Sequence, residues 1–282
     1  MPKLTILTAA YGPSATYLHE TADSVLNQKL PEHWEMEWIV QEDGCNPALA
    51  DMLGRYSQAQ YEANGLQLGI GNTRNLALSR ATGDLVQVLD HDDVLLPGAL
   101  ATLIQRFEQH PIQWAVGAAD DLLEDGTRRS WNSDLPFGIV TAGTANRWAD
   151  EHGGNWPVHC AGLMIRMEIL RAIGGWAGTP VDDDIVLFAA LSELSRGWNE
   201  EAVTWLYRHH PDQTTRSTTW QSLSQTGRRI ALQRIAALRN VGFRFDDTAS
   251  LQFGYNSTDV HVGQALKKPP RSLPGGKFTD RS

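Results

Sequence analysis

The sequence predicts an α/β protein in which helices flank a mostly parallel central sheet. Short aliphatic runs alternate with segments of helical period along the first half of the chain, the pattern of a parallel sheet with crossover helices. Polar or acidic residues follow three of these runs, at positions 8–11, 42–43 and 90–92. With 282 residues, the chain can form one large α/β domain or two small ones with a stable core.

The expected elements follow from periodicity and turn residues. Strands are expected at residues 4–9, 37–41, 85–89 and 204–207. Helices are expected at residues 15–28, 47–55, 69–80, 97–110, 185–195 and 226–240. Residues 161–173 should form a strand that leads into a helix, which Gly174-Gly175 ends. Residues 124–160 lack a clear period and are expected to be a long loop region with one short helix at 142–151.

Composition and charge narrow the class of protein. Hydrophobic content of 41% and charged content of 20% are ordinary for a globular protein. A net charge of −9 argues against a nucleic-acid partner bound through a general basic surface. No apolar run approaches the roughly 20 residues of a transmembrane segment. Two cysteines, Cys45 and Cys160, indicate no disulfide framework; each is expected to be a small core residue with a free thiol, and a cytoplasmic location is the default.

The run Asp90-His91-Asp92-Asp93 is the strongest sign of chemistry. Three carboxylates lie within four residues, directly after the apolar strand 85–89. Such charges repel one another unless a cation or a cationic substrate compensates them. Hard oxygen ligands suit Mg²⁺ or Mn²⁺, often bound together with substrate phosphates. The structural alternative is an acidic turn in which Asp93 caps the helix 97–110.

Several motifs, in consistent order over roughly residues 3–215, make the chain resemble family 2 glycosyltransferases. The sequence TILTAAYGP is followed by Ser24-Val25-Leu26-Asn27-Gln28, and the acidic turn of the family appears as Glu42-Asp43-Gly44-Cys45. A Gly-x-x-x-x-Arg-Asn segment ends in Arg74-Asn75, and the Asp-x-Asp-Asp motif is Asp90 to Asp93. The resemblance implies the GT-A fold, a nucleotide-binding α/β sheet with a metal-binding motif after a central strand.

The resemblance also implies roles for the donor-site residues. Thr8, Ala10 and Tyr11 would line the nucleotide site, and Asp43 would accept a hydrogen bond from the uracil ring. Arg74 would contact the base or the diphosphate, for which its fixed fork of donors is suited.

The same resemblance implies a metal site at the acidic run. Asp92 would be the direct ligand of Mn²⁺ or Mg²⁺, with Asp90 and His91 beside the ribose or the metal-bound water. A Tyr-Arg-x-His segment corresponds to Tyr207-Arg208-His209-His210 and would bring His210 to the metal or the diphosphate.

The catalytic base is implied by the acids that follow Gly174-Gly175-Trp176. Here they are Asp182-Asp183-Asp184, and the register leaves two residues open: Asp184 is favoured as the base, and Asp183 is the alternative. Acids at a helix start are also favoured by the helix dipole, so capping and catalysis can coexist. Loop residues Trp156, His159 and Trp176 are candidates for acceptor binding, since indole faces stack on sugar rings.

Together these implications predict a metal-dependent inverting hexosyltransferase that uses a UDP-sugar. Glucose or N-acetylglucosamine is favoured as the sugar, and a saccharide or another small molecule as the acceptor; the oligomeric state stays open. The transferase domain would span 1–215, with a nucleotide-sugar half at 1–120 and an acceptor half at 121–215. A helical extension would follow at 216–266 and a flexible basic tail at 267–282.

Three alternatives stay open from the sequence. A sugar-phosphate nucleotidyltransferase would want a basic residue in the loop after the first strand, and residues 9–17 contain none. A non-catalytic sugar-nucleotide-binding protein would have no need of the intact acids at 90, 92, 183 and 184. A metal-dependent phosphoesterase would usually have more His and Asp ligands at the strand ends.

Overall fold

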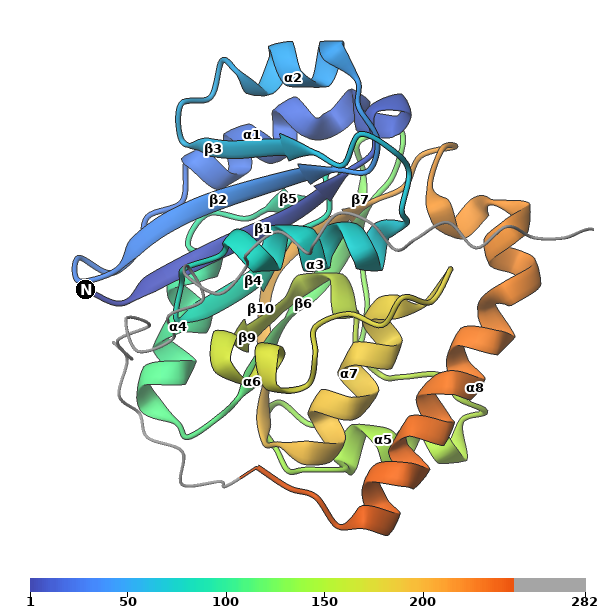
Figure 1. Cartoon of the computed structure of the whole chain (residues 1–282). Coiled ribbons are helices and arrows are strands. Elements are labelled where there is room, and N and C mark those ends of the chain that lie inside the picture. Colours follow the sequence, from blue (N-terminus) through green and yellow to red (C-terminus); the bar gives the residue numbers. More distant parts are fainter. Residues whose placement is uncertain (246–282) are drawn as a thin grey trace, which may run out of the picture.

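A ten-stranded mixed sheet forms the centre of the molecule. The structure is a computed structural model that describes residues 1–245, so the predicted end of the helical extension and the basic tail lie outside the described residues. The order of the main strands is β3-β2-β1-β4-β9-β6-β10-β5 (Figure 1). In addition, β7 pairs with β6 and β8 pairs with β10. The strands are β1 Lys3–Ala10, β2 Glu35–Glu42, β3 Ala59–Ala63, β4 Leu85–Val88, β5 Val94–Leu95, β6 Trp114–Leu122, β7 Arg128–Ser130, β8 Gly138–Val140, β9 Leu163–Arg166 and β10 Gly197–Arg208.

The predicted α/β class and its GT-A-like arrangement are confirmed. Strands β3, β2, β1 and β4 are parallel, and β6 runs parallel to β10. Strand β9 enters between β4 and β6 antiparallel to both, and β5, β7 and β8 also pair antiparallel. The sheet is therefore parallel in the first part of the chain and mixed in the second.

Helices cover both faces of the sheet. The α-helices are α1 Leu18–Leu26, α2 Pro47–Leu53, α3 Ile70–Arg80, α4 Ala99–Gln109, α5 Thr144–Glu151, α6 Met167–Ala172, α7 Asp183–Leu194 and α8 Thr218–Val241. Short 3₁₀ helices lie at Gly12–Tyr17 (η1), Cys160–Gly162 (η2) and Thr214–Arg216 (η3). No helix within residues 1–245 has the length and apolar character that a membrane span requires.

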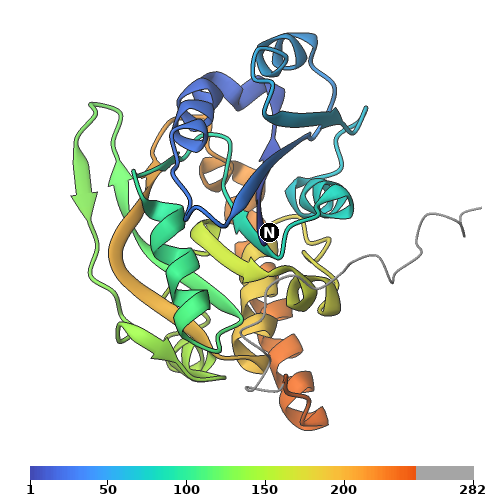
Figure 2. The ribbon, with the colours of Figure 1, turned by 90° about the vertical axis from the view of Figure 1, so that its left-hand side faces the viewer.

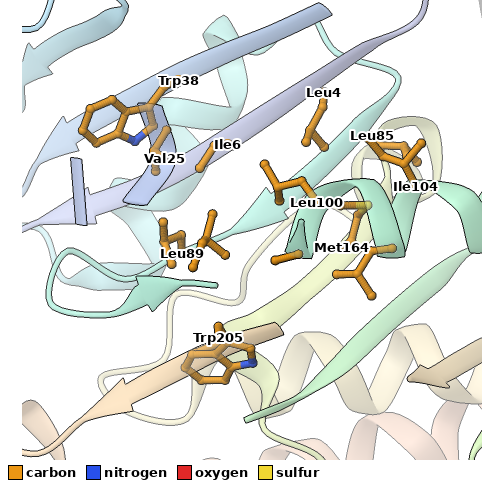
Figure 3. Close-up of a cluster of buried hydrophobic side chains, with 14 of the residues drawn as sticks. Leu4, Ile6, Val25, Trp38, Leu85, Leu89, Leu100, Ile104, Met164 and Trp205 are labelled. Carbon is orange, nitrogen blue, oxygen red and sulfur yellow. The ribbon is translucent and has the colours of Figure 1, made fainter. Parts of the chain in front are cut away.

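Alternation along the strands divides the core into two layers. Leu4 and Ile6 of β1 pack with α1 and α4 on one face (Figure 3). Leu7, the residue after Ile6, instead joins the layer that α3, α6 and α7 cover. This period of two is the geometry of a strand that is buried on both faces, so both faces of β1 carry apolar side chains.

Most predicted elements are present, and the differences have local causes. Helix α8 begins at Thr218 rather than at residue 226, because the Ser217 hydroxyl accepts the Trp220 N–H at 3.1 Å and caps it. Strand β10 begins at Gly197 rather than at 204, with irregular register between Glu200 and Trp205, and it bends as it crosses the molecule (Figure 2). Strands β3, β5, β6, β7 and β8 were not predicted, and β7 and β8 lie within residues 124–160, where the sequence predicted a loop region with one short helix.

Two further predictions from sequence are wrong. Asp93 does not cap the helix after it, because α4 starts after Gly98 in the left-handed region with no side-chain cap. The Asp93 carboxylate instead accepts the Arg208 backbone N–H at 3.0 Å. Cys160 is a buried free thiol as expected, but Cys45 is exposed and is not part of the core.

Candidate active site

A cavity of about 360 Å³ opens at the carboxyl end of β4. In open α/β sheets this edge is where ligands bind. The turn after β4, the start of α7, the loop at 155–160 and the start of α8 form its walls. Its lining includes the following predicted site residues: Arg74, Asp90, His91, Asp92, Trp156, His159, Asp183 and Asp184.

Arg74 ties the acidic turn to the start of α7. Its guanidinium donates to Asp90 Oδ1 at 2.5 Å and to Asp183 Oδ2 at 3.0 Å, and its side chain is only 3% exposed. Burial by itself lowers the pKa of this guanidinium, but the two carboxylates outweigh it and raise the pKa, so Arg74 stays charged. Residues 16 and 109 positions away in the chain are thus fixed around one cation.

The three acids at the start of α7 occupy different environments. Burial raises the pKa of Asp183 to about 7, even though Arg74 lies beside it. Asp184 is half-buried and lines the cavity, and its Oδ1 accepts its neighbour's N–H, from Ile185, at 2.8 Å. Asp182 adopts a left-handed conformation with φ of 56°, the one positive φ of a non-glycine residue among residues 1–245. The ion pair with Arg74 therefore belongs to Asp183, whereas Asp184 faces the cavity.

Asp92 and His210 meet on the other side of the acidic turn. Their Oδ2 and Nε2 atoms lie 2.8 Å apart, and the His210 side chain is 3% exposed. Arg208 holds this arrangement, since its Nε donates to the Asp92 carbonyl at 2.8 Å and its Nη2 to Glu20 at 2.6 Å. The Tyr17 ring packs under the Arg208 guanidinium at 4.3 Å.

The described residues offer a divalent cation a partial set of ligands. A carboxylate and an imidazole from Asp92 and His210 converge. A carboxylate suits Mg²⁺ or Mn²⁺, and an imidazole beside it favours a transition-metal ion over Mg²⁺. Within residues 1–245, however, no three His, Cys, Asp or Glu side chains converge as a complete protein site. The donor set thus fits a cation that is completed by substrate phosphates.

Asp43 anchors the loop that precedes α3. Its carboxylate accepts the Leu68 N–H at 2.6 Å and the Gly69 N–H at 3.0 Å, and also a side-chain N–H of Asn64 at 3.2 Å. It is 7% exposed and does not line the cavity. The structure therefore gives Asp43 a role in shaping this loop, and its contact with a uracil ring stays a prediction.

Three further residues predicted around the nucleotide, Thr8, Ala10 and Tyr11, lie at the end of β1. The Thr8 side chain is fully buried and its hydroxyl accepts the Trp38 indole N–H at 3.1 Å, so burial does not support direct contact with a ligand. The Ala10 carbonyl accepts the Asp43 N–H at 2.7 Å, whereas Tyr11 is 38% exposed. His91 lies at the cavity and contacts the Ser14 hydroxyl at 3.1 Å, which links η1 to the acidic turn.

The three candidates for acceptor binding, Trp156, His159 and Trp176, differ in whether they reach the cavity. Trp156 is half-buried and its indole N–H donates to Asn146 Oδ1 at 2.8 Å, and His159 is exposed and packs edge-on against Trp205. Both line the cavity. Trp176 is 2% exposed in the core below Arg74, whose guanidinium lies 5.9 Å from its ring, so burial does not support a contact with a sugar.

The sequence reasoning missed residues that the start of α8 brings to the cavity. Trp220 and Arg228 line its wall, together with Thr214 and Thr215 of η3. Arg228 also donates to the Gly154 carbonyl at 3.3 Å. The amphipathic period of the helix indicated its existence, but nothing in the sequence placed it over the strand ends.

Comparison with known proteins defines the class. The chain belongs to glycosyl transferase family 2, whose family model matches residues 5–174. Membership in this family supports a role in glycosyl transfer.

Individual relatives match only part of their own length. TuaG of Bacillus subtilis, a putative teichuronic acid biosynthesis glycosyltransferase, is 28% identical over 130 residues, covering 45% of this chain and 50% of that protein. The uncharacterized protein y4gI of Sinorhizobium fredii is 29% identical over 152 residues, 49% of this chain and 16% of that protein. The chain thus spans about half or less of these two relatives.

Solved structures show the same fold. The structure of S. aureus TarS in complex with UDP-GlcNAc aligns with a TM-score of 0.64 and 14% identity, over 86% of this chain and 74% of that one. The structure of TarS with UDP aligns with a TM-score of 0.58 over 85% of this chain and 72% of that one, also at 14% identity. At this level of identity the likeness concerns the fold.

Proposed function

We propose that the protein is an inverting, metal-dependent glycosyltransferase that moves a hexose from a UDP-sugar to an acceptor hydroxyl. Glucose or N-acetylglucosamine is the favoured sugar, and the TarS complex with UDP-GlcNAc supports a donor of this kind. The observation that carries the proposal is the single cavity that gathers Arg74, Asp92 and Asp184, each from a different segment of the chain.

Donor binding in this proposal uses the acidic turn and Arg74. Asp92 and His210, with Asp90 nearby, would hold Mn²⁺ or Mg²⁺. When bound, such a cation neutralises charge that develops on a diphosphate leaving group. Arg74 is held by Asp90 and Asp183, and it adds a fixed positive charge to the same wall.

Asp184 is the proposed catalytic base. An acceptor hydroxyl must lose its proton as it attacks the anomeric carbon, and a carboxylate at the cavity surface can accept that proton. Asp184 is in that position, whereas Asp183 is 3% exposed and is paired with Arg74. The geometry thus favours the first of the two registers that the sequence left open.

The first test separates binding from transfer. Thermal-shift titrations with UDP-glucose and UDP-N-acetylglucosamine, with and without Mn²⁺, should show stabilisation that requires metal and is lost in Asp92→Ala. Asp184→Asn should keep donor binding while donor hydrolysis and transfer fall by about a hundredfold or more. Near-normal turnover in Asp184→Asn would refute the assignment of the base. Binding without any turnover in the wild type would favour a non-catalytic sugar-nucleotide-binding protein.

A further inference from the structure

A second cavity of about 260 Å³ lies beside the proposed active site. It is bounded by β6, by the segment that follows β7 and by the middle of β10. Trp156, Val158 and His159 line both cavities, so the second begins where the first ends. We call this second cavity the side groove.

Two aromatic side chains stand exposed in the side groove. Trp131 is 62% exposed and Phe137 is 48% exposed, large values for side chains of this size. The Arg129 guanidinium packs on the Trp131 ring at 4.9 Å and is itself held by Asp121 Oδ2 at 3.0 Å. The Trp131 ring is therefore held in place by its contact with Arg129, although it is exposed to solvent.

Hydrogen bonds also hold the rest of the groove in place. The Asn199 side chain on β10 donates to the Leu135 carbonyl at 3.0 Å and to the Ser133 hydroxyl at 2.9 Å, which fixes the segment that carries Phe137. At the boundary with the active site, Asn146 holds the Trp156 indole. A preformed groove loses little ordering entropy when a ligand binds.

The charges of the side groove favour an uncharged ligand. Its lining includes Asp120, Asp134 and Glu201, and no lysine or arginine among the described residues. Asp120 Oδ2 accepts a hydrogen bond from the Arg128 guanidinium, while the buried Oδ1 of Asp120 has no hydrogen-bond partner within residues 1–245. The excess of carboxylates in this lining disfavours an anionic polymer, and carboxylate oxygens accept hydrogen bonds from hydroxyl groups.

We propose that the side groove binds an uncharged saccharide acceptor that is at least two sugar units long. The unit that receives the hexose sits in the first cavity, and the next unit stacks on Trp131 and Phe137. Apolar faces of sugar rings match exposed aromatic rings, and ring hydroxyls match the acids and amides between them. This inference rests on the proposed function, whose active site it extends.

The test uses the full-length protein and a ladder of neutral gluco-oligosaccharides of one to four units. A second ladder of the same lengths carries one uronate or phosphate per unit. Binding is followed by isothermal titration calorimetry without donor, and transfer is followed with UDP-N-acetylglucosamine and with UDP-glucose. Affinity for the neutral ladder should rise about tenfold from one unit to two, and the anionic ladder should bind more weakly at every length.

Variants assign the gain to the groove. Trp131→Ala and Phe137→Ala should each remove most of the gain from the second unit while leaving donor hydrolysis and the melting temperature unchanged. Trp148→Ala is the matched control, because this indole stacks on His152 and lines neither cavity.

The two proposals fail in different ways. If no neutral saccharide binds, or if the anionic ladder binds more tightly, the groove proposal is overturned, and donor hydrolysis still reports on the proposed function. If saccharides bind with the expected length dependence but no UDP-sugar is bound or hydrolysed, the proposed function fails and the groove stands as a saccharide site.

Discussion

At the scale of single residues, Arg74 decides how the site is assembled. One guanidinium bonds two carboxylates from different segments, at 2.5 and 3.0 Å, inside the protein. A planar fork with several fixed N–H groups can do this, and a single ammonium group cannot reproduce it. Sequence motifs suggested a contact between Arg74 and the donor, but only the structure shows that it also joins Asp90 to Asp183.

Arg74→Lys should therefore be damaging although it keeps the charge. We expect a loss of about 1–3 kcal/mol in the free energy of unfolding and at least about a tenfold weaker affinity for the donor. Urea denaturation and a donor titration measure the two effects. Arg80→Lys on the same helix is the control, because Arg80 is nearer the surface and pairs with the exposed Glu62. Equal donor affinity in Arg74→Lys and in the wild type would contradict the role of the fork.

Glu37 contributes stability that depends on pH. Burial tends to raise its pKa, but the Thr5 hydroxyl at 2.6 Å and the N–H and hydroxyl of Thr82 outweigh burial and lower it below 4.5. A carboxyl whose pKa is depressed by folding stabilises the fold above its unfolded value, and that contribution is lost as the pH falls through the folded value.

Glu37→Gln should lower the free energy of unfolding by about 1–2 kcal/mol at pH 7. The difference from the wild type should shrink as the pH falls from about 4.5 through the lower pKa of the folded carboxyl, because the Glu37 carboxyl becomes protonated over that range. Urea denaturation at pH 7 and at a series of acidic pH values measures it. Glu35→Gln on the same strand is exposed and should show little change at either pH. A pH-independent loss in Glu37→Gln would mean that shape rather than charge is responsible.

At the scale of elements, the position of α3 depends on a close approach at Gly71. A Cβ atom at this position would lie 2.7 Å from the Ala177 carbonyl oxygen and 3.1 Å from Asp183 Cβ. The absence of a side chain lets α3 lie against the start of α7, and this brings Arg74, one turn later, within reach of Asp183.

Gly71→Ala tests this contact. Alanine favours a helix by about 1 kcal/mol, but overpacking against backbone costs about 1–3 kcal/mol, so a net loss of stability is expected together with weaker donor binding. Melting temperature and donor affinity are the measurements. Leu76→Ala on the same helix, at a side chain 41% exposed, should change the free energy of unfolding by no more than about 0.5 kcal/mol. A more stable Gly71→Ala variant with full donor affinity would show that the backbone at Ala177 can move to make room for the Cβ atom at little cost.

At the scale of the whole molecule, the proposed metal site depends on the donor. The described residues bring Asp92 and His210 together but no third acidic, imidazole or thiol ligand. A site with two protein ligands binds a divalent cation weakly by itself and more tightly once phosphate oxygens complete its shell. Metal and donor should consequently stabilise the protein together rather than separately.

Chelation distinguishes this arrangement from a preformed metal site. EDTA should leave the melting temperature of the free protein unchanged and abolish the additional stabilisation by UDP-sugar and Mn²⁺. That stabilisation is expected to be about 2.7 kcal/mol when the donor is at a hundred times its Kd. Differential scanning calorimetry of the wild type and Asp92→Ala provides the measurement. A lower melting temperature for the free wild type in EDTA would show that a metal is part of its fold.

The sequence by itself determined the α/β class and most of the elements. Local signals suffice for these: apolar runs flanked by turn residues for β1, β2 and β4, helical period for α3 and α4, and paired glycines with positive φ at the end of α6. The same local order of motifs identified the family, which the family model confirms over residues 5–174. Short strands such as β3 and β7 were not predicted, because their stability comes from pairing with other strands and not from a local sequence pattern.

Tertiary structure alone decided which candidate residues share one cavity. Asp183 and Asp184 are neighbours of identical chemistry, and only the packing of α3 against α7 turns one towards Arg74 and leaves the other at the cavity surface. Thr8 and Trp176 fit the sequence pattern for the site but are buried, whereas Trp220 and Arg228 reach the cavity because α8 folds across its edge. The physical reason is that side-chain direction and burial are set by contacts between segments far apart in sequence, which a local pattern does not contain.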